Sequence, residues 1–181
     1  MKKLSEMTLE ELWALFPIIL TEHDERWSDW YNDEEACLKP LLPGSAKIHH
    51  IGSTAVSGIW AKPIIDILIE TADENELASA VAVLKKNGYL LMNQTSARAS
   101  LNKGYTQQGF AEKVFHIHIR LCGDNDEIYF RNYLNENRDA AKEYEALKLQ
   151  LWKRFEHDRD GYTAAKAEMV KKYTEIAKKK Y

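Results

Sequence analysis

The sequence has little of what marks secreted, disulfide-bonded or membrane-spanning proteins. Its 181 residues contain only two cysteines, Cys37 and Cys122, too few for a disulfide framework and without the C-x-x-C spacing of zinc or redox motifs. No stretch approaches the ~20 apolar residues of a membrane span. Glu6, Glu10 and Glu11 interrupt the apolar residues near the N-terminus, which the core of a signal peptide does not tolerate. We therefore expect a cytoplasmic protein with reduced thiols and no membrane partner.

An excess of charge of one sign is also missing. Lysine and arginine total 25 against 28 acidic residues, and the formal net charge is -3. A nucleic acid would need a local basic patch, because the whole chain exerts no attraction on polyanions. The C-terminal lysines lie on a predicted amphipathic helix, where lysines usually belong to a solvated face, so a nucleic-acid partner is the less favoured interpretation. They are Lys166, Lys171, Lys172, Lys178, Lys179 and Lys180.

Length and composition predict one domain over residues 1–181. The hydrophobic fraction of 45% is ordinary for a globular chain that buries one sizeable core. No internal repeat or low-complexity linker interrupts it. We expect the sheet core over about residues 17–122 and C-terminal helices over about residues 126–180.

Hydrophobic periodicity and capping residues predict the elements. Thr8 and Glu11 form a capping box for a first helix that Pro17 ends. Asp24 and Asp73 are expected to cap two further helices. Strands are predicted at residues 18–20, 47–51, 62–70, 89–94, 97–103 and 113–121, the last two joined as a hairpin across the 104–109 loop. The class is α/β, in the sense of α+β, with a helical C-terminal third.

Gly52, Ser53 and Thr54 follow a predicted strand and form the first candidate site. Glycine lets the backbone turn sharply and approach a ligand, so this segment could hold a phosphate. An ordinary turn is the alternative, since glycine and serine favour turns for local reasons.

The strand at residues 62–70 carries the most informative residue, Asp66. Alternation places Lys62, Asp66, Leu68 and Glu70 on one face. A carboxylate between β-branched neighbours is costly to desolvate unless it binds a cation or accepts hydrogen bonds. An acid at a strand end that points to water is the alternative, and it suits Glu70 better than Asp66.

The strand Phe115–Arg120 places His116, His118 and Arg120 on one face. Two imidazoles and a guanidinium can ligate a metal, move a proton or bind phosphate. An exposed polar sheet face is the alternative. We expect at least one of these histidines to share a polar pocket with His50 near Asp66.

Together these segments resemble the GrpB family. The resemblance lies in residues 48–59 and 61–67, in Lys103-Gly104-Tyr105, in Phe115–His118, and in later segments at residues 131–134, 143–148 and 162–163. GrpB proteins are similar to nucleotidyltransferases of the DNA polymerase beta type. The resemblance implies their fold, a mixed, largely antiparallel sheet with flanking helices. In that pattern a Gly-Ser turn precedes alternating acids by about a dozen residues, and here residues 54–65 separate Ser53 from Asp66.

The resemblance also implies a divalent metal ion, Mg²⁺, Mn²⁺ or Zn²⁺. The acids of the pattern would be Asp66 and Glu70, but Leu68 stands where the second acid is expected. His116 and His118 stand where a third acid is expected. A site of carboxylates and imidazoles suits Mn²⁺ or Zn²⁺ better than the oxygen-preferring Mg²⁺.

Two functions remain open after this comparison. One is metal-dependent nucleotidyl or phosphoryl transfer to a small acceptor, with Asp66, Glu70 and His118 as catalytic residues. The other is binding of a nucleotide or phosphorylated metabolite, or of a partner, without catalysis. In either case the substrate-binding residues would be Gly52, Ser53, Thr54, Lys62, Lys103 and Arg120.

Overall fold

The structure, a computed structural model, describes residues 2–181 and is built on a five-stranded sheet. The strands are β1 (Lys47–Ile51), β2 (Ile65–Thr71), β3 (Leu90–Gln94), β4 (Arg98–Thr106) and β5 (Gly109–Leu121). They lie in the order β1-β2-β5-β4-β3. Only the β2–β5 pair is parallel, and the other three pairs are antiparallel. The expected mixed, largely antiparallel sheet is thus confirmed.

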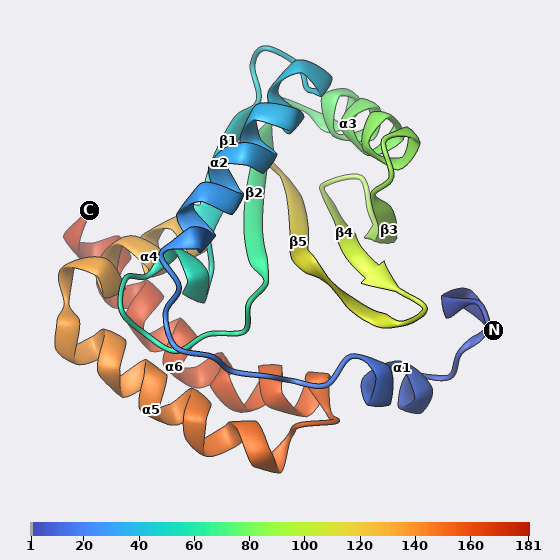
Figure 1. The fold of residues 1–181 in the computed structure, drawn as a ribbon. Coiled ribbons are helices and arrows are strands. Elements are labelled where there is room, and N and C mark those ends of the chain that lie inside the picture. Colours follow the sequence, from blue (N-terminus) through green and yellow to red (C-terminus); the bar gives the residue numbers. More distant parts are fainter. Residues whose placement is uncertain (1) are drawn as a thin grey trace.

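Six α-helices surround the sheet or follow it (Figure 1). They are α1 (Leu9–Leu15), α2 (Arg26–Leu38), α3 (Glu74–Lys86), α4 (Asp126–Glu136), α5 (Arg138–Arg154) and α6 (Arg159–Lys180). The last three confirm the helical C-terminal third. Within residues 2–181, no helix combines the length and the apolar character needed to cross a membrane.

Capping residues begin two of these helices as their chemistry predicts. Thr8 and Glu11 form the capping box of α1, and Asp73 accepts a hydrogen bond from the Glu76 amide at the start of α3. The prediction for Asp24 was displaced by one residue, because Glu25 is the N-cap of α2. Asp24 instead accepts from the Arg26 amide at 2.9 Å.

One face of the sheet forms the main hydrophobic core under α2 and α3. The β-branched residues Ile65, Ile67 and Ile69 of β2 point to this face together with Phe115 and Ile117 of β5. Trp27 and Leu38 of α2 and a stripe of α3 complete the cluster. This burial provides most of the driving force for packing both helices against the strands.

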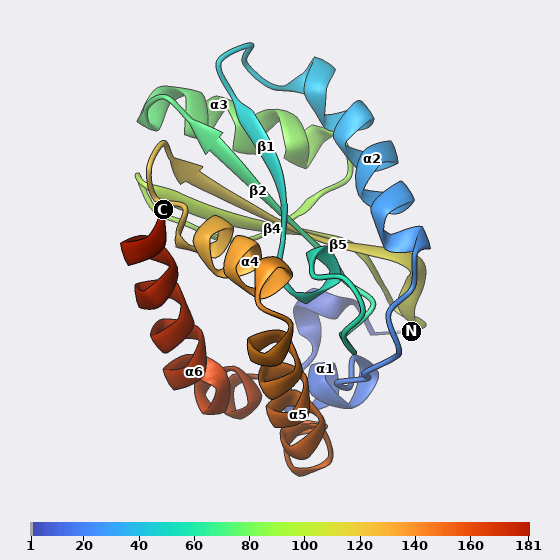
Figure 2. The same ribbon diagram turned by 90° about the vertical axis from the view of Figure 1, so that its left-hand side faces the viewer.

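The opposite face carries the polar residues of β2 and β5, and α4, α5 and α6 lie on that side (Figure 2). A second cluster joins Val56 and Ile59 from the segment before β2 to Phe130, Tyr144 and Tyr173 from the three helices. The C-terminal helices are therefore held against the segment that leads into β2. The polar sheet face is enclosed from that side.

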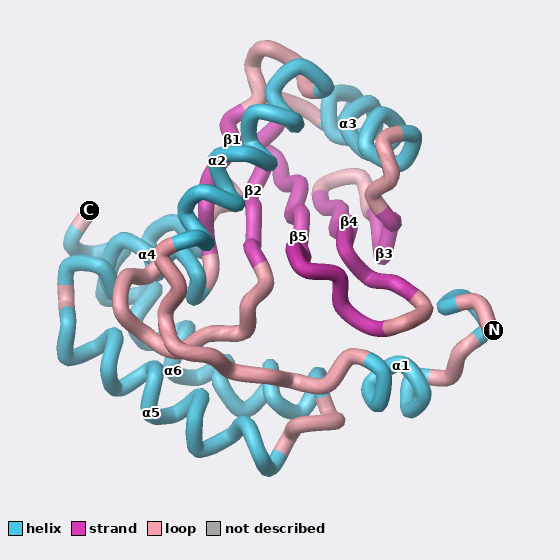
Figure 3. The backbone as a smooth tube through the Cα atoms, in the orientation of Figure 1, coloured by secondary structure: helices cyan, strands magenta, loops and turns pink. Residues whose placement is uncertain are grey.

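Two long connecting segments, before α2 and before β2, run beside the C-terminal helices (Figure 3). The predicted strand at residues 18–20 was wrong, because this segment does not join the sheet. The Ile18 amide donates to the carbonyl of Glu156 at 2.8 Å, and Trp152 Nε1 donates to the Ile18 carbonyl at 2.6 Å. Only an isolated bridge between Thr21 and Ala61 has strand character. The backbone of Ile18 thus satisfies its hydrogen bonds with neighbours outside the sheet.

The hairpin of β4 and β5 is confirmed, but its strands run further than the sequence predicted. Thr106 pairs with Gly109, so the turn is only two residues long. The register shifts between Lys103 and Tyr105, around Gly104 with its φ of +92°. Glycine here permits a bulge inside the strand and not the loop that we expected.

Candidate functional site

Asp66 lies near the start of β2, opposite His116 of the parallel strand β5. Leu68 lies opposite His118, so alternation brings all four side chains to the polar face of the sheet. Asp66 Oδ1 is 3.1 Å from His118 Nε2 and 3.3 Å from His116 Nδ1. One oxygen of the carboxylate thus contacts both imidazoles.

These three residues form the one group of histidine, cysteine and acidic side chains within residues 2–181 whose ligand atoms all lie within 4.8 Å of one another. Each is part-exposed, with 28% of the Asp66 side chain, 14% of His116 and 25% of His118 accessible to solvent. Two nitrogens and a carboxylate oxygen are a donor set that suits Mn²⁺ or Zn²⁺. The residues present therefore fit one divalent cation.

Gly52 holds the turn after β1 directly against this carboxylate. A Cβ atom at position 52 would lie 2.6 Å from Asp66 Oδ2, and the φ of +74° is one that side-chain-bearing residues rarely adopt. Thr54, two residues on, donates to the Ile64 carbonyl at 3.4 Å and lies 3.0 Å from His50 Nε2. The Gly52–Thr54 segment and the start of β2 are therefore fixed relative to each other.

His116 has a defined tautomer because its other nitrogen faces Arg159. Arg159 Nη2 lies 3.0 Å from His116 Nε2 and 3.1 Å from the Tyr105 hydroxyl, which is itself 2.7 Å from Nε2. A guanidinium can only donate. We therefore assign Nε2 as an acceptor and place the proton on Nδ1, toward Asp66.

A cavity of about 310 Å³ opens beside these residues and joins the sheet to the C-terminal helices. Its lining comprises Gly52, Ser53, Thr54, Lys62, Ile64, Asp66, His116, His118, Tyr144, Lys148, Arg159, Tyr162, Thr163 and Lys166. Four of these side chains are lysine or arginine, and only Asp66 is acidic. The wall facing the Asp66 cluster is therefore strongly cationic, as a site for an anionic ligand requires.

The pKa values of the cavity residues reflect this crowding of charge. Burial disfavours the charge on Asp66, but hydrogen bonds from His116 and His118 outweigh it and hold the pKa of Asp66 well below its usual value. Burial lowers the pKa of His116. Burial, reinforced by neighbouring cations including Lys166, lowers the pKa of both Lys62 and Lys148 to about 7. Asp66 is thus ionised, while two cavity lysines are poised to lose their protons near neutral pH.

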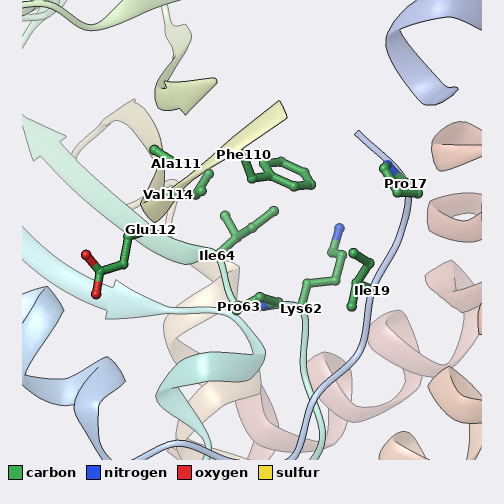
Figure 4. Close-up of a pocket in the computed structure, with 9 residues that line it drawn as sticks. All are labelled: Pro17, Ile19, Lys62, Pro63, Ile64, Phe110, Ala111, Glu112 and Val114. Atoms are coloured by element: carbon green, nitrogen blue, oxygen red, sulfur yellow. The ribbon is translucent and has the colours of Figure 1, made fainter. Parts of the chain in front are cut away.

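Lys62 also reaches a second, smaller cavity of about 70 Å³ beside the site. Figure 4 shows Lys62 standing between Ile64 and Ile19, with Phe110 and Pro17 nearby. Lys62 and Ile64 line both cavities. The methylene chain of Lys62 is therefore surrounded by apolar groups, which explains the desolvation of its ammonium group.

Three predicted site residues lie away from this cavity. Glu70, at the far end of β2, accepts from the amides of Gly123 and Asn125 at 3.0 Å and contacts His49. Lys103 lies opposite Phe115, on the core face of the sheet, and pairs with Glu34 at 2.8 Å. Arg120 lies beside Glu127 and Asp124. The structure brings together Gly52, Ser53, Thr54, Lys62, Asp66, His116 and His118, but not these three.

The prediction that His50 shares the pocket was wrong, although His116 and His118 both lie in it. His50 pairs with Ile67 in the register of β1 and β2, so it points to the core face. Its ring stacks on Tyr31 of α2 at 4.7 Å, and burial lowers the pKa of His50 to about 4. His50 supports the turn through Thr54 and does not approach Asp66 directly.

Several cavity residues from α5 and α6 were not assigned a role from the sequence. Lys148, Arg159 and Tyr162 had no signal of their own, and Lys166 was interpreted as part of a solvated helix face. The only hint was that residues 143–148 and 162–163 belong to the segments that carry the family resemblance.

Comparisons with known proteins agree on one family. Residues 17–176 match the model of the family described as GrpB protein. The UPF0157 protein YqkA of Bacillus subtilis is 30% identical over 98% of this chain and 53% of its own length, so this chain spans about half of that relative. Glutamate-rich protein GrpB of Alkalihalophilus pseudofirmus is 35% identical over 84% of this chain and 91% of its own length.

A solved structure of the family gives the same result. The crystal structure of conserved protein GrpB from Enterococcus faecalis aligns with a TM-score of 0.78 at 32% identity, covering 90% of this chain and 99% of that one. The Cid1 poly(U) polymerase with bound MgGTP shows only a loose likeness, with a TM-score of 0.48 and 15% identity over 78% of this chain and 44% of its own. The family match and the relatives together show that this chain belongs to the GrpB family.

Proposed function

We propose that this chain binds a nucleotide or another phosphorylated small molecule together with one divalent cation, and that it transfers a phosphoryl or nucleotidyl group. The observation that carries this proposal is the arrangement of one cavity. Asp66, His116 and His118 lie on its sheet wall, and lysine and arginine side chains line its remaining walls. A cation centre facing a cationic wall suits a ligand that brings several negative charges.

The cation would be held by Asp66 Oδ1, His118 Nε2 and His116 Nδ1. For His116 this requires its proton to move to Nε2, so Arg159 must turn away from that nitrogen and the Tyr105 hydroxyl, at 2.7 Å, becomes the acceptor. Such a partner for the distal nitrogen is usual behind a metal-binding histidine. A bound cation supplies Lewis-acid polarisation of a phosphoryl oxygen. Ser53, Thr54 and Lys62 lie in the same cavity to position the phosphates.

Binding without transfer is the second candidate, and one observation favours it. Two-metal chemistry needs oxygen ligands on both sides of a pair of cations about 4 Å apart. Leu68 is fully buried, and Glu70 is engaged with His49, Gly123 and Asn125. Asp66 is then the one carboxylate available, so we expect at most one tightly bound cation.

The first test is to titrate the purified protein with Mn²⁺ and compare it with Asp66→Asn. We expect one Mn²⁺ per wild-type chain and an affinity more than ~100-fold weaker in the variant. The fold should remain, because the Asn oxygen can still accept from the imidazoles. Asp33→Asn, which removes a carboxylate that is 72% exposed, is the control and should bind Mn²⁺ normally. Equal affinity in Asp66→Asn would contradict the cation site.

The second arm separates transfer from binding. We would measure ATP binding calorimetrically with and without Mn²⁺, and analyse the nucleotides by anion-exchange chromatography after incubating ATP and Mn²⁺ with saturating protein. Binding that Mn²⁺ strengthens in the wild type, but not in Asp66→Asn, supports the shared site. Appearance of ADP, AMP or pyrophosphate supports transfer, whereas ATP recovered unchanged supports the non-catalytic alternative.

A further inference from the structure

One tyrosine that lines the cavity has a buried hydroxyl group without a hydrogen-bond partner in the part of the chain that the structure describes. Tyr162, in the first turns of α6, is completely buried and lines the cavity. Its hydroxyl has no hydrogen-bond partner within residues 2–181. A buried polar group without a partner carries a desolvation penalty, so such groups are rare and point to a missing partner.

Two ammonium groups lie near the same ring. The ammonium group of Lys166 lies 4.3 Å from the centre of the Tyr162 ring, and that of Lys62 lies 5.6 Å from it. Lys148 lines the same cavity and donates to the Trp60 carbonyl. Glu145 is the acid nearest to Lys148, but it is already bonded to Lys142 and to the Trp60 amide. The charges on this wall are therefore largely uncompensated by the protein.

The hydroxyl group can only act here as a neutral donor or acceptor. Burial raises the pKa of Tyr162, so the phenol keeps its proton at any physiological pH. Beside several ammonium groups, which offer no lone pairs, a hydroxyl finds its best partner in an anion that accepts from all of them.

We propose that Tyr162, Lys148 and Lys166, with Lys62, form an anion subsite that holds a phosphate group of the ligand without the help of a metal ion. The subsite lies in the same cavity as Asp66 but is built by α5, α6 and the segment before β2. The inference rests on the proposed function for the ligand class. The atoms that would contact the anion differ from those that would bind the cation. Experiments can therefore support or refute the anion subsite independently of the cation site.

The test uses inorganic pyrophosphate as the probe and the full chain in buffer with a chelator that removes divalent cations. We expect calorimetric binding to the wild type. Tyr162→Phe, which removes only the unpartnered oxygen, should weaken the affinity about tenfold and leave the melting temperature unchanged or higher. Lys166→Met should weaken it by at least ~10-fold.

Lys171→Met is the matched control, since Lys171 lies on the same helix with 78% of its side chain exposed and does not line this cavity. We expect its pyrophosphate affinity to stay within about twofold of wild type. Inorganic phosphate and ADP, titrated in the same buffer, distinguish a site for free phosphate from one that needs the nucleotide. Stronger binding of ADP than of both inorganic anions would identify the nucleotide as the source of the phosphate.

Absence of binding by all three probes to the metal-free wild type would overturn the proposal. So would equal pyrophosphate affinity in wild type, Tyr162→Phe and Lys166→Met. Asp66→Asn separates the two sites, because it should lose Mn²⁺ and still bind pyrophosphate without metal. If Mn²⁺ binding fails in the wild type while pyrophosphate binds as described, only the cation site is wrong.

Discussion

At the scale of single residues, the geometry around Asp66 depends on the absence of a side chain at position 52. The carboxylate occupies the space where a Cβ atom of residue 52 would lie. This close approach lets one carboxylate contact the turn after β1 and both histidines of β5. The same acid in an ordinary strand would be exposed to solvent or would cost stability.

Gly52→Ala should therefore reduce Mn²⁺ affinity as well as stability. A non-glycine residue at such a φ costs about 1–3 kcal/mol, and the new Cβ would also displace Asp66. Gly88→Ala is the control, because Gly88 also has a positive φ, of +88°, but a Cβ atom there would meet no other atom within 4 Å. Urea denaturation should show both variants destabilised. Only Gly52→Ala should also lose Mn²⁺ affinity, and equal Mn²⁺ binding in both variants would contradict this contact.

At the scale of elements, β2 carries an acid near each end, and the two acids do different things. Asp66 faces the cavity, whereas Glu70 fastens the far end of β2 to the loop that leads into α4. Alternation predicted correctly that both lie on one face. It could not predict that α4 and its preceding loop would cover Glu70, because that contact joins residues more than 50 positions apart in the sequence.

Glu70→Gln tests this division of roles. Loss of a buried carboxylate that accepts from a backbone amide and a side-chain amide should cost about 1–3 kcal/mol of the free energy of unfolding at pH 7. Burial opposes the charge on Glu70, but hydrogen bonds from Gly123 and His49 leave its pKa below the usual value. A carboxyl group whose pKa is lower in the folded state stabilises that state at pH values above its unfolded pKa of about 4.3. The stability difference from wild type should thus shrink as the pH falls through the lower folded pKa.

The Mn²⁺ affinity of Glu70→Gln provides the decisive comparison for this variant. It should equal that of the wild type, since Glu70 contributes nothing to the cavity. A loss of Mn²⁺ affinity comparable with that of Asp66→Asn would restore Glu70 to the cation site.

The limits of prediction from this sequence also appear at the element scale. Local signals located the five strands of the sheet, the caps of α1 and α3, and the face shared by Asp66, His116 and His118. Lys103 was assigned to the substrate by its charge, although it alternates with Ala99 and Leu101 and pairs with Phe115, which places it on the core face. Lys148 and Tyr162 reach the cavity only because α5 and α6 fold back over the polar face of the sheet. The local pattern of an amphipathic helix does not predict which face of the sheet the helix will cover.

At the scale of the whole molecule, the cavity lies where the sheet meets the C-terminal helices, so ligand binding should couple to protonation. Lys62 and Lys148 each have a pKa of about 7, and both face Lys166. Arg159 and Asp66 also lie near Lys62, and Glu145 lies near Lys148. A bound polyanion would raise both lysine pKa values. Above pH 7 it should therefore bind with uptake of protons, at most one for each lysine.

Calorimetry of pyrophosphate binding at pH 8, in buffers with different ionisation enthalpies, measures that uptake. The apparent enthalpy should depend on the buffer, and affinity should fall between pH 6.5 and pH 8.5. The stability of the ligand-free protein should change with pH in the opposite direction to the affinity. Because the unfolded lysines titrate near 10.4, unfolding above pH 7 binds protons, and the free energy of unfolding gains a term that rises with pH. A buffer-independent enthalpy would show that these lysines are already charged.

Anomalous diffraction from crystals of the wild-type chain grown with Mn²⁺ and pyrophosphate tests the central claim most directly. The account predicts one manganese peak within coordination distance of Asp66 Oδ1, His116 Nδ1 and His118 Nε2, with the pyrophosphate between that peak and the Tyr162 hydroxyl. Two manganese ions at Asp66, or pyrophosphate and manganese bound only outside this cavity, would contradict it.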